Sequence, residues 1–513
     1  QGDETLLAAL VTTLDAMAQG GFYDQVGGGF HRYSTDDAWL VPHFEKMLYN
    51  QAQLARVYLQ AYELTKNPFY ARIAEHTLDY VLREMTSTQG GFYSATDADS
   101  EGEEGTFFVW TTAQLNSALS SQDAALIIDL FGVTEQGNFE GSNVLYLPLS
   151  LSDYSRQASI TLPVLLTRLD AILDTLRQVR QQRVAPLRDD KILTAWNGMM
   201  VTTLVMANEI LAKPKYLVAA ERCADFIWQI NRTIDNQMWR VHMRGNSSIP
   251  AVQEDYAYLA EAMIALYDAN QGQKYINRSM LLVDEMIAQF WDEDVGGFYM
   301  DKVSTVPTMA RMKQSIDGAM PSGNSVALKV LTQLAKRTST LDYANKATVM
   351  RAVFAEDIVN NPRSYGYFLR AIRDQISGET GARQYAAQGA VTIHRQWTMS
   401  QDKIDFSLLI TIADGWHINA TKPLDKDLIA TEVTLSDILV WELDKINYPN
   451  AIIKSLGFSQ QPLALYEGTI EITGSLLAVD KPRSLPTFIE LAIQACNEKT
   501  CLAPEKIKFR LLN

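Results

Sequence analysis

Residues 20–55 read GGFYDQVGGGFHRYSTDDAWLVPHFEKMLYNQAQLA, a glycine-rich loop that runs directly into an amphipathic helix. Burying an unpaired polar group costs about 1–3 kcal/mol, so packing alone does not account for so many polar side chains in one loop. The glycines permit tight backbone turns that other residues avoid. We therefore interpret the loop as the lining of a polar pocket, formed by His31, Arg32, Tyr33, Asp36, Trp39, His43 and Glu45.

Apolar residues recur at helical spacing on both sides of this stretch, as far as about residue 385. After the loop, for example, Leu48, Ala52, Ala55 and Leu59 follow one another at intervals of three or four residues, as on one face of a helix. The tetrapeptide GGFY occurs at 20–23, 90–93 and 296–299, each time shortly after the expected end of a helix. Such repeats indicate stacked pairs of antiparallel helices.

The chain changes character in the segment 378–389, where we place the domain boundary. Beyond it the sequence reads as short extended runs, such as 391–398, 404–412 and 465–479, separated by Gly, Pro and Asp turns. This pattern predicts a β-sandwich. The expected domains are therefore a helical one at 1–380 and a β domain at 386–513.

Composition narrows the classes of function. The chain has 513 residues, 45 of them basic and 60 acidic, for a net charge of −15. No basic block suggests a nucleic-acid partner, and no apolar run has the roughly 20 residues needed to cross a bilayer. Three cysteines are too few for a disulfide framework, and Cys223 reads as a buried core thiol. Because the chain starts at Gln1 without a methionine or a signal sequence, we expect targeting information upstream of it.

Polar clusters stand at the starts of four expected helices, in the segments 42–52, 188–200, 253–263 and 317–329. If paired helices close into a ring, these starts surround a central cavity, and helix N-termini suit oxygen-rich ligands. Each acidic or hydroxyl residue there could instead be an ordinary N-cap, and four together favour a pocket. The residues expected to approach one cavity are His31, His43, Glu45, Asp190, Asn197, Asp255 and Asn324.

The acidic segment 96–105, TDADSEGEEG, contains the first half of a calcium loop. The closing bidentate carboxylate is missing, because Phe108 occupies the twelfth position. We therefore favour Asp97 and Asp99 as pocket carboxylates, and we predict no metal and no cofactor.

Several long motifs carry a resemblance to a known family. GGFYDQVGGGFHRYSTDDAWLVPHFEKMLYN, GGFYSATDADSEGEEGTFFVW, LRDDKILTAWNGMM, EDYAYL and IDGAMPSGNSVAL resemble the large thioredoxin-domain-containing proteins related to spermatogenesis-associated protein 20, over roughly residues 1–375. The resemblance implies an α/α toroid of the six-hairpin glycosidase type, shared with N-acylglucosamine and cellobiose 2-epimerases. Family members carry a thioredoxin-like domain and a further helical segment before the point where this chain starts, so closure of the ring stays open.

The last 125 or so residues resemble the immunoglobulin-like N-terminal domain of DsbD, which delivers reducing equivalents to the bacterial periplasm. The motifs are DGWHINATKPL at 414–424, INYPNA at 446–451, LYEGTIEI at 465–472 and ACNEKTCLAPEKIKF at 495–509. The resemblance implies that Cys496 and Cys501 form a dithiol/disulfide pair. Their spacing across a turn is compatible with a Cα separation of about 5.5–6 Å. A purely structural clip is the alternative, and two thiolates alone leave zinc short of ligands.

Two hypotheses of different classes follow. In the first, a carbohydrate-active enzyme stacks aromatic rings on sugar faces, and His31 and His43 move protons for epimerisation or carboxylate pairs act in hydrolysis. In the second, the toroid is a non-catalytic module that binds a glycan or a protein client beside a redox domain. The candidate catalytic residues are His31, His43, Glu45, Asp190, Asp255, Cys496 and Cys501, and the candidate binding residues are Arg32, Tyr33, Trp39, Asp97, Asp99, Trp196, Asn197, Tyr256, Ser322 and Asn324.

The expected partners are a sugar or glycan and a protein that exchanges disulfides, with neither nucleic acid nor membrane insertion. Disulfides persist in oxidising compartments. The pair and the DsbD resemblance together predict an extracytoplasmic, periplasmic protein, with the cytoplasm as the alternative.

Overall fold

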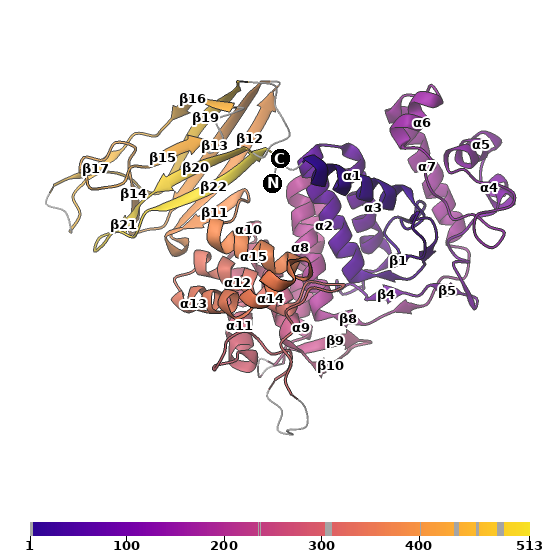
Figure 1. The fold of residues 1–513 in the computed structure, drawn as a ribbon, viewed down its shortest axis with the longest axis horizontal. Coiled ribbons are helices and arrows are strands. Elements are labelled where there is room, and N and C mark those ends of the chain that lie inside the picture. Colours follow the sequence, from indigo (N-terminus) through magenta and orange to yellow (C-terminus); the bar gives the residue numbers. More distant parts are fainter. Residues whose placement is uncertain are drawn as a thin grey trace. The chain divides into compact units, whose positions relative to one another are not determined.

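The computed structural model describes residues 4–233, 235, 237–302, 310–400, 402–435, 441–457, 461–479 and 487–512. They form two compact units, Asp3–Gly272 and Gln273–Asn513. The first is mostly helical, and the second has helices followed by antiparallel strands (Figure 1). Helix gives way to strand between Ser377 and Arg383, close to the expected position. The domain bounds 1–380 and 386–513 stay predictions.

The first unit is built from pairs of helices. Its helices are α1 (Glu4–Gln19), α2 (Leu48–Thr65), α3 (Pro68–Glu84), α4 (Thr112–Ala118), α5 (Ser121–Leu130), α6 (Leu151–Gln157), α7 (Leu162–Arg180), α8 (Thr194–Leu211), α9 (Pro214–Ile230) and α10 (Gln253–Asp268). Helix α2 packs against α3 and α8, and α8 packs against α9 and α10. The predicted apolar stripe of α2 is confirmed, since Leu48, Ala52, Ala55 and Leu59 are all fully buried.

Short strands fix the starts of α2, α8 and α10 relative to one another (Figure 1). The sheet β3-β4-β7 joins the strands that precede α2 and α8, and the sheet β8-β9-β10 joins those that precede α8 and α10. The strands of this unit are β1 (Tyr33–Ser34), β2 (Pro42–His43), β3 (Lys46–Met47), β4 (Ala95–Thr96), β5 (Asp99–Ser100), β6 (Glu103–Glu104), β7 (Arg188–Asp189), β8 (Ile192–Leu193), β9 (Trp239–Met243) and β10 (Asn246–Pro250).

The Gly-Gly-Phe repeat forms the same turn three times. In each turn the N–H of the first glycine donates to the carbonyl of a residue three or four positions earlier: Gly28 to Asp24, Gly90 to Ser87 and Gly296 to Asp292. The first glycine has positive φ in all three turns (76°, 114° and 91°), a conformation that favours glycine. The repeat is therefore confirmed, but its register differs: residues 28–31, not the GGFY at 20–23, correspond to 90–93 and 296–299.

A carboxamide side chain clamps the phenylalanine of each turn. The Gln51 Oε1 accepts from the Phe30 N–H at 2.8 Å, and Nε2 donates to the Phe30 carbonyl at 2.6 Å. The Asn197 amide bonds both backbone groups of Phe92 in the same way, at 2.7 and 3.0 Å. The third clamp joins Asn324 to Phe298, at 2.9 Å for both bonds. These side chains lie near the starts of α2, α8 and α12 (Gly323–Arg337), so each clamp ties a turn to the start of a helix.

The second unit begins with helices and continues with antiparallel strands. Its helices are α11 (Gln273–Phe290), α12 (Gly323–Arg337), α13 (Leu341–Val353), α14 (Ala355–Asn360) and α15 (Gly366–Ser377), with 3₁₀ turns η1 (Pro362–Tyr365) and η2 (Ala387–Gly389). Helix α12 packs against α13 and α15. The strands are β11 (Arg383–Ala386), β12 (Val391–Ser400), β13 (Lys403–Ile412), β14 (Trp416–Asn419), β15 (Glu432–Leu435), β16 (Trp441–Asn447), β17 (Ile452–Lys454), β18 (Leu463–Tyr466), β19 (Thr469–Ala478), β20 (Thr487–Ile493), β21 (Ala495–Asn497) and β22 (Glu505–Leu512).

Three antiparallel sheets make up this β region: β11-β12-β13-β19-β16, β17-β18-β14-β21 and β15-β20-β22. Alternate residues of β13, such as Phe406, Leu408 and Ile410, point into one apolar core, which Ile489 of β20 and Phe509 of β22 also enter. The two-residue period of strands explains this burial, because it places every second side chain on the same face.

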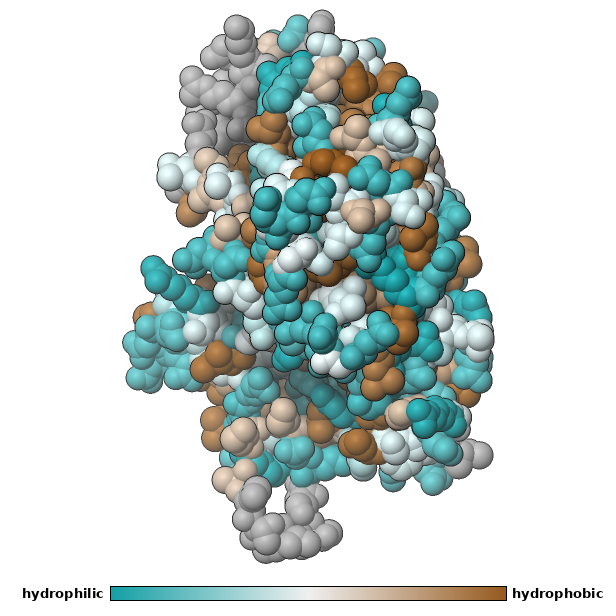
Figure 2. Space-filling model, turned by 90° about the vertical axis from the view of Figure 1, so that its right-hand side faces the viewer, coloured by the Kyte–Doolittle hydropathy of each residue, from teal (hydrophilic) through white to brown (hydrophobic). Residues whose placement is uncertain are grey.

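Hydrophobic residues on the face in Figure 2 lie scattered among hydrophilic ones, as is normal for protein surfaces. Among the described residues, no helix combines the length and the apolar character that a membrane span requires.

Candidate functional site

A partly exposed polar cluster lies just before α2. The His43 ring is held between two carboxylates: Nδ1 lies 2.7 Å from Glu104 Oε1, and Nε2 lies 3.6 Å from Glu45 Oε2. Arg32 donates to the same Glu45 oxygen at 2.8 Å. The Tyr33 ring stacks on His43, with centroids 5.0 Å apart, and is half exposed. Because the His43 side chain is 27% exposed, this acid–base group is open to solvent.

Contacts connect this cluster to the starts of α8 and α10. Tyr49, in the first turn of α2, takes part in a hydrogen bond with Arg32. Its ring packs edge-on against Trp196, in the first turn of α8, with centroids 4.9 Å apart. The N–H of Ala195 donates to Asp255 Oδ1, in the first turn of α10, at 3.1 Å. Three helix starts are therefore linked by side-chain contacts within this unit, and we call this group of contacts the rim.

His31 and its surroundings are closed to solvent. His31 is 1% exposed, and its Nδ1 lies 2.9 Å from the Phe44 carbonyl. Burial, with the charge of Lys46 nearby, lowers the pKa of His31 to about 3, so the ring is neutral at neutral pH. It lines a cavity of about 10 Å³, room for one water at most. A direct role for His31 in proton transfer to an external ligand would need that cavity to open.

A buried ion cluster lies beside His31. Asp24 accepts hydrogen bonds at 2.8 Å from Lys46 and from two nitrogens of Arg180, and its Oδ1 also accepts from the N–H groups of Val26 and Gly27. Although burial alone would raise it, the two cations hold the pKa of Asp24 well below its ordinary value. The sequence analysis did not single out this cluster.

The acid–base pair of this cluster recurs at the third Gly-Gly-Phe turn, whereas the second turn has uncharged residues at the corresponding positions. Lys313 contacts Asp292 at 2.5 Å and the Gly296 carbonyl at 2.8 Å, as Lys46 contacts Asp24 and the Gly28 carbonyl. In the turn at 87–93 the corresponding positions hold Ser87 and Ile192, which are both uncharged. The turn at 87–93 thus has neither the acidic nor the basic member of the pair at these positions, as expected because a buried charge without a partner is costly.

The remaining candidate residues divide by exposure. Fully buried are Asn197, Tyr256, Ser322 and Asn324, whereas Trp39, Asp97, Asp99, Asp190 and Trp196 reach the surface to some extent. Asn197 and Asn324 bond backbone groups with both ends of their amides, which leaves no polar atom directed at a ligand. Asp190 accepts from Arg188 at 2.7 Å. Asn324 and Ser322 belong to the second unit, so their approach to a common cavity stays a prediction.

Asp255 is the one candidate carboxylate that is wholly buried. Its Oδ2 accepts from Arg240 and from the Val252 N–H, both at 3.0 Å. Burial raises its pKa to about 6, although Arg240 and the backbone amides oppose the rise. No group of three or more His, Cys, Asp or Glu residues in the described part of the chain is arranged to hold a metal ion.

The raised pKa of Asp255 predicts a pH dependence of stability. Because the folded state binds this proton more tightly than the unfolded state, the carboxyl contributes most below about pH 4, and its contribution declines as the pH rises to about 6. Denaturant unfolding of the wild type and Asp255→Asn should show their difference in free energy of unfolding falling by about 1–3 kcal/mol over that interval. A difference that is independent of pH would contradict the assignment.

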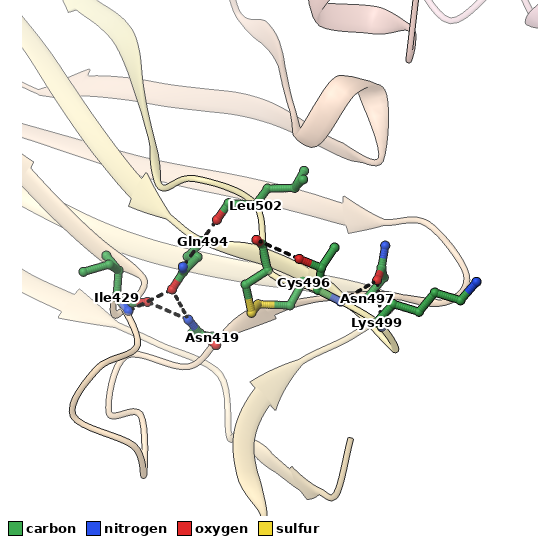
Figure 3. Close-up of a disulfide and its surroundings, with 9 residues drawn as sticks. Asn419, Ile429, Gln494, Cys496, Asn497, Lys499 and Leu502 are labelled. Atoms are coloured by element: carbon green, nitrogen blue, oxygen red, sulfur yellow. Dashed lines mark hydrogen bonds between the residues drawn. A yellow bond between two sulfur atoms is a disulfide. The ribbon is translucent and has the colours of Figure 1, made fainter. Parts of the chain in front are cut away.

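Cys496 and Cys501 form a disulfide (Figure 3). Their Cα atoms are 3.9 Å apart, closer than expected. They face each other across a hairpin whose turn Asn497 stabilises, since its Oδ1 accepts from the N–H groups of Lys499 and Thr500. Cys496 is fully buried, and Cys501 is partly exposed. Cys501 is therefore the more exposed of the two cysteines.

Curated animal proteins are similar to this chain in sequence. The chain is 33% identical to spermatogenesis-associated protein 20 of Homo sapiens over 398 residues, 71% of this chain and 51% of that protein. It is 30% identical to an uncharacterized protein of Caenorhabditis elegans over 370 residues, 66% of this chain and 50% of that protein. The chain spans about half the length of these curated relatives. No protein-family model matches it.

Solved structures give more distant likenesses. Cellobiose 2-epimerase from Spirochaeta thermophila aligns with 69% of this chain and 71% of its own, at 10% identity and a TM-score of 0.42. The N-terminal domain of DsbD from Neisseria meningitidis, in the reduced form, aligns with 24% of this chain and 86% of its own, at 15% identity and a TM-score of 0.18.

Three residues of the rim were not foreseen from the sequence. Glu104 bonds His43 from 61 positions away, and no spacing signal links the two. Tyr49 connects the starts of α2 and α8, and Arg240 of β9 bonds the start of α10, yet each reads in the sequence as an ordinary residue of a helix or a strand. The available signal was position: Tyr49 lies in the polar segment 42–52, and Glu104 lies in the acidic segment 96–105.

Proposed function

We propose that the helical unit binds and processes a sugar at the rim formed by the starts of α2, α8 and α10, within a six-hairpin α/α toroid. The observation that carries this proposal is the position of His43, which is solvent-accessible, stacked on Tyr33 and held between Glu104 and Glu45. Exposed aromatic rings can stack on sugar faces. Carboxylates and Arg32 can bond sugar hydroxyls.

The geometry supports proton transfer by His43. Glu104 accepts from Nδ1, which therefore carries a hydrogen, so proton exchange with a ligand falls to Nε2. A base of this kind can remove a proton from a carbon beside a carbonyl, as epimerisation requires, or from a hydroxyl. Glu45, next to Nε2, can then stabilise the imidazolium that forms. Hydrolysis by a carboxylate pair is the second outcome to test.

We further propose that the strand region is an immunoglobulin-like sandwich that exchanges disulfides through Cys496 and Cys501, in an extracytoplasmic, oxidising compartment. The partial exposure of Cys501 supports this proposal. The partner would be a protein with a reactive dithiol.

The rim is tested with the full chain and a panel of reducing mono- and disaccharides in D₂O. Epimerisation exchanges the sugar C2 hydrogen for deuterium, whereas hydrolysis releases new reducing ends. We expect His43→Gln to lower turnover about a hundredfold or more, because it removes the base but keeps a polar side chain of similar length.

The matched control is His394→Gln, a change of a partly buried histidine on β12 that leaves the rim intact. Binding by calorimetry without turnover would favour the non-catalytic module instead. Equal turnover by His43→Gln and the wild type would remove His43 from the reaction.

A further inference from the structure

His417 lies directly opposite Cys496 in the antiparallel pair β14/β21. On the other side of Cys496 stands Cys501. Directly opposite residues of an antiparallel pair share one face, with Cβ atoms about 4.5–5.5 Å apart. The Cys496 side chain is therefore flanked by an imidazole on one side and by its disulfide partner on the other.

The imidazole is buried with an unused polar atom. His417 is 2% exposed, and its Nε2 has no hydrogen-bond partner within the described part of the chain. Such an atom costs about 1–3 kcal/mol, so its retention calls for an explanation. Packing alone would be served as well by Phe.

The free-energy cost of the unpartnered His417 nitrogen is explained if this nitrogen forms a hydrogen bond when the disulfide opens. In the oxidised pair the Cys496 sulfur carries no charge and is at most a weak acceptor. After the bond opens, Cys496 becomes a buried thiolate, a strong acceptor that requires a donor. His417 stands directly opposite Cys496 in the ladder, and its ring can supply one.

We propose that His417 is a positioning residue for disulfide exchange, whose Nε2–H donates a hydrogen bond to the Cys496 sulfur once the disulfide opens. This inference rests on the exchange function proposed above. It assigns the order of events to the two sulfurs: Cys501 is attacked, and Cys496 leaves.

The reaction balances as a two-electron exchange. A thiolate of a partner dithiol attacks Cys501 Sγ, the S–S bond breaks, and its electron pair goes to Cys496 Sγ, where His417 stabilises the charge. The second partner thiolate attacks the partner sulfur of the mixed disulfide, and Cys501 leaves as a thiolate. Both cysteine thiolates take protons from water, so the pair is reduced to a dithiol and the partner is oxidised to a disulfide.

Other charges near His417 bear on any pH dependence. Glu467, Lys454 and Glu498 act on its ring electrostatically, and Lys454 and Glu467 form an ion pair at 2.7 Å. Burial lowers the pKa of His417, so the ring is neutral at neutral pH and donates without carrying charge.

The test uses the full chain with dithiothreitol as the dithiol. We compare the rate of opening of the disulfide, followed by alkylation and mass spectrometry, in the wild type, His417→Phe and His417→Gln. We expect a fall of about tenfold or more for Phe, and recovery of most of the rate for Gln, whose amide places a donor near the Nε2 position. His394→Phe is the matched control and should open at the wild-type rate.

A second measurement separates this role from packing. In a Cys501→Ser background Cys496 is an unpaired thiol, and its thiolate can be titrated by ultraviolet absorbance. Cys223, the other free thiol, is fully buried, and burial raises its pKa, so it does not titrate in the same range. We expect His417→Phe to raise the Cys496 pKa by about one unit and His417→Gln to leave it near the parent value. If Phe does not fold, His417→Asn, which places its amide near Nδ1 instead, replaces it in both measurements.

The outcomes are distinguishable. Suppose that dithiothreitol reduces the wild-type disulfide and that His417→Phe changes neither the opening rate nor the Cys496 pKa. This result would overturn the role of His417 and leave exchange intact. A wild-type disulfide that resists dithiothreitol would overturn exchange, and the role of His417 with it.

Discussion

Replacing Asp24 with alanine is expected to destabilise the helical unit by about 3–5 kcal/mol, because Lys46 and Arg180 would remain buried without their counter-charge. Asp24 is 6% exposed, and both cations bond its carboxylate at 2.8 Å. The loss should appear as a lower denaturant midpoint, followed by circular dichroism. Asp174→Ala is the control, since it also removes a carboxylate that pairs with an arginine, here at the surface within α7, and it should leave the midpoint nearly unchanged.

The uncharged turn of the second repeat gives a sharper version of this test. Asp24→Ser with Lys46→Ile copies the Ser87 and Ile192 arrangement and removes one of the two stranded cations. We expect the double variant to be more stable than Asp24→Ser alone, although Arg180 still lacks a partner. If Lys46→Ile lowers the stability of Asp24→Ser further, charge pairing is not the contribution of Asp24 to stability.

Asn197→Ala is expected to destabilise the same unit by about 2–4 kcal/mol, because the N–H and C=O of Phe92 each lose a partner at about 1–3 kcal/mol. Asn197→Asp should be at least as damaging at neutral pH. One carboxylate oxygen of the new aspartate still accepts from the Phe92 N–H. The other oxygen would face the carbonyls of Phe92 and Leu193, to which Asn197 Nδ2 donates in the wild type. Denaturant unfolding at two pH values measures both effects.

The pH dependence of Asn197→Asp identifies the cause. Burial between two carbonyls raises the pKa of the new carboxyl in the folded state, so the variant loses stability as the pH rises above the unfolded value near 4. Asn246→Ala, an exposed change, should cost less than about 0.5 kcal/mol. If Asn197→Asp is as stable as the wild type at every pH, the hydrogen bonds of Asn197 to Phe92 do not contribute to stability as their geometry indicates.

The elements were largely predictable, because helix and strand periodicity are local properties. The spacing of Leu48, Ala52, Ala55 and Leu59 predicted the buried face of α2. The change from helix to strand lies close to where the extended pattern begins in the sequence. The repeated turn was also visible. Its register was not, because GGFY at 20–23 matches the other copies in letters while GGFH at 28–31 matches them in hydrogen bonds.

The candidate site was only half predictable. The sequence alone determined which loop carries exposed acid–base chemistry, since a cluster such as Arg32, Tyr33, His43 and Glu45 cannot all be buried cheaply. Two other residues chosen by the same reasoning, His31 and Asn197, turn out to be buried and bonded to backbone groups.

Only the tertiary structure decided which charges meet. Glu104 reaches His43 across 61 positions, and Arg180 reaches Asp24 across 156. Periodicity fixes the face on which a side chain stands, but the partner on the opposite face depends on how helices and turns pack. For this chain the sequence therefore determined the paired helices, the strands and the polar loop, whereas packing between distant segments decided that His43 is an accessible acid–base group and that the Asp24 cluster is internal.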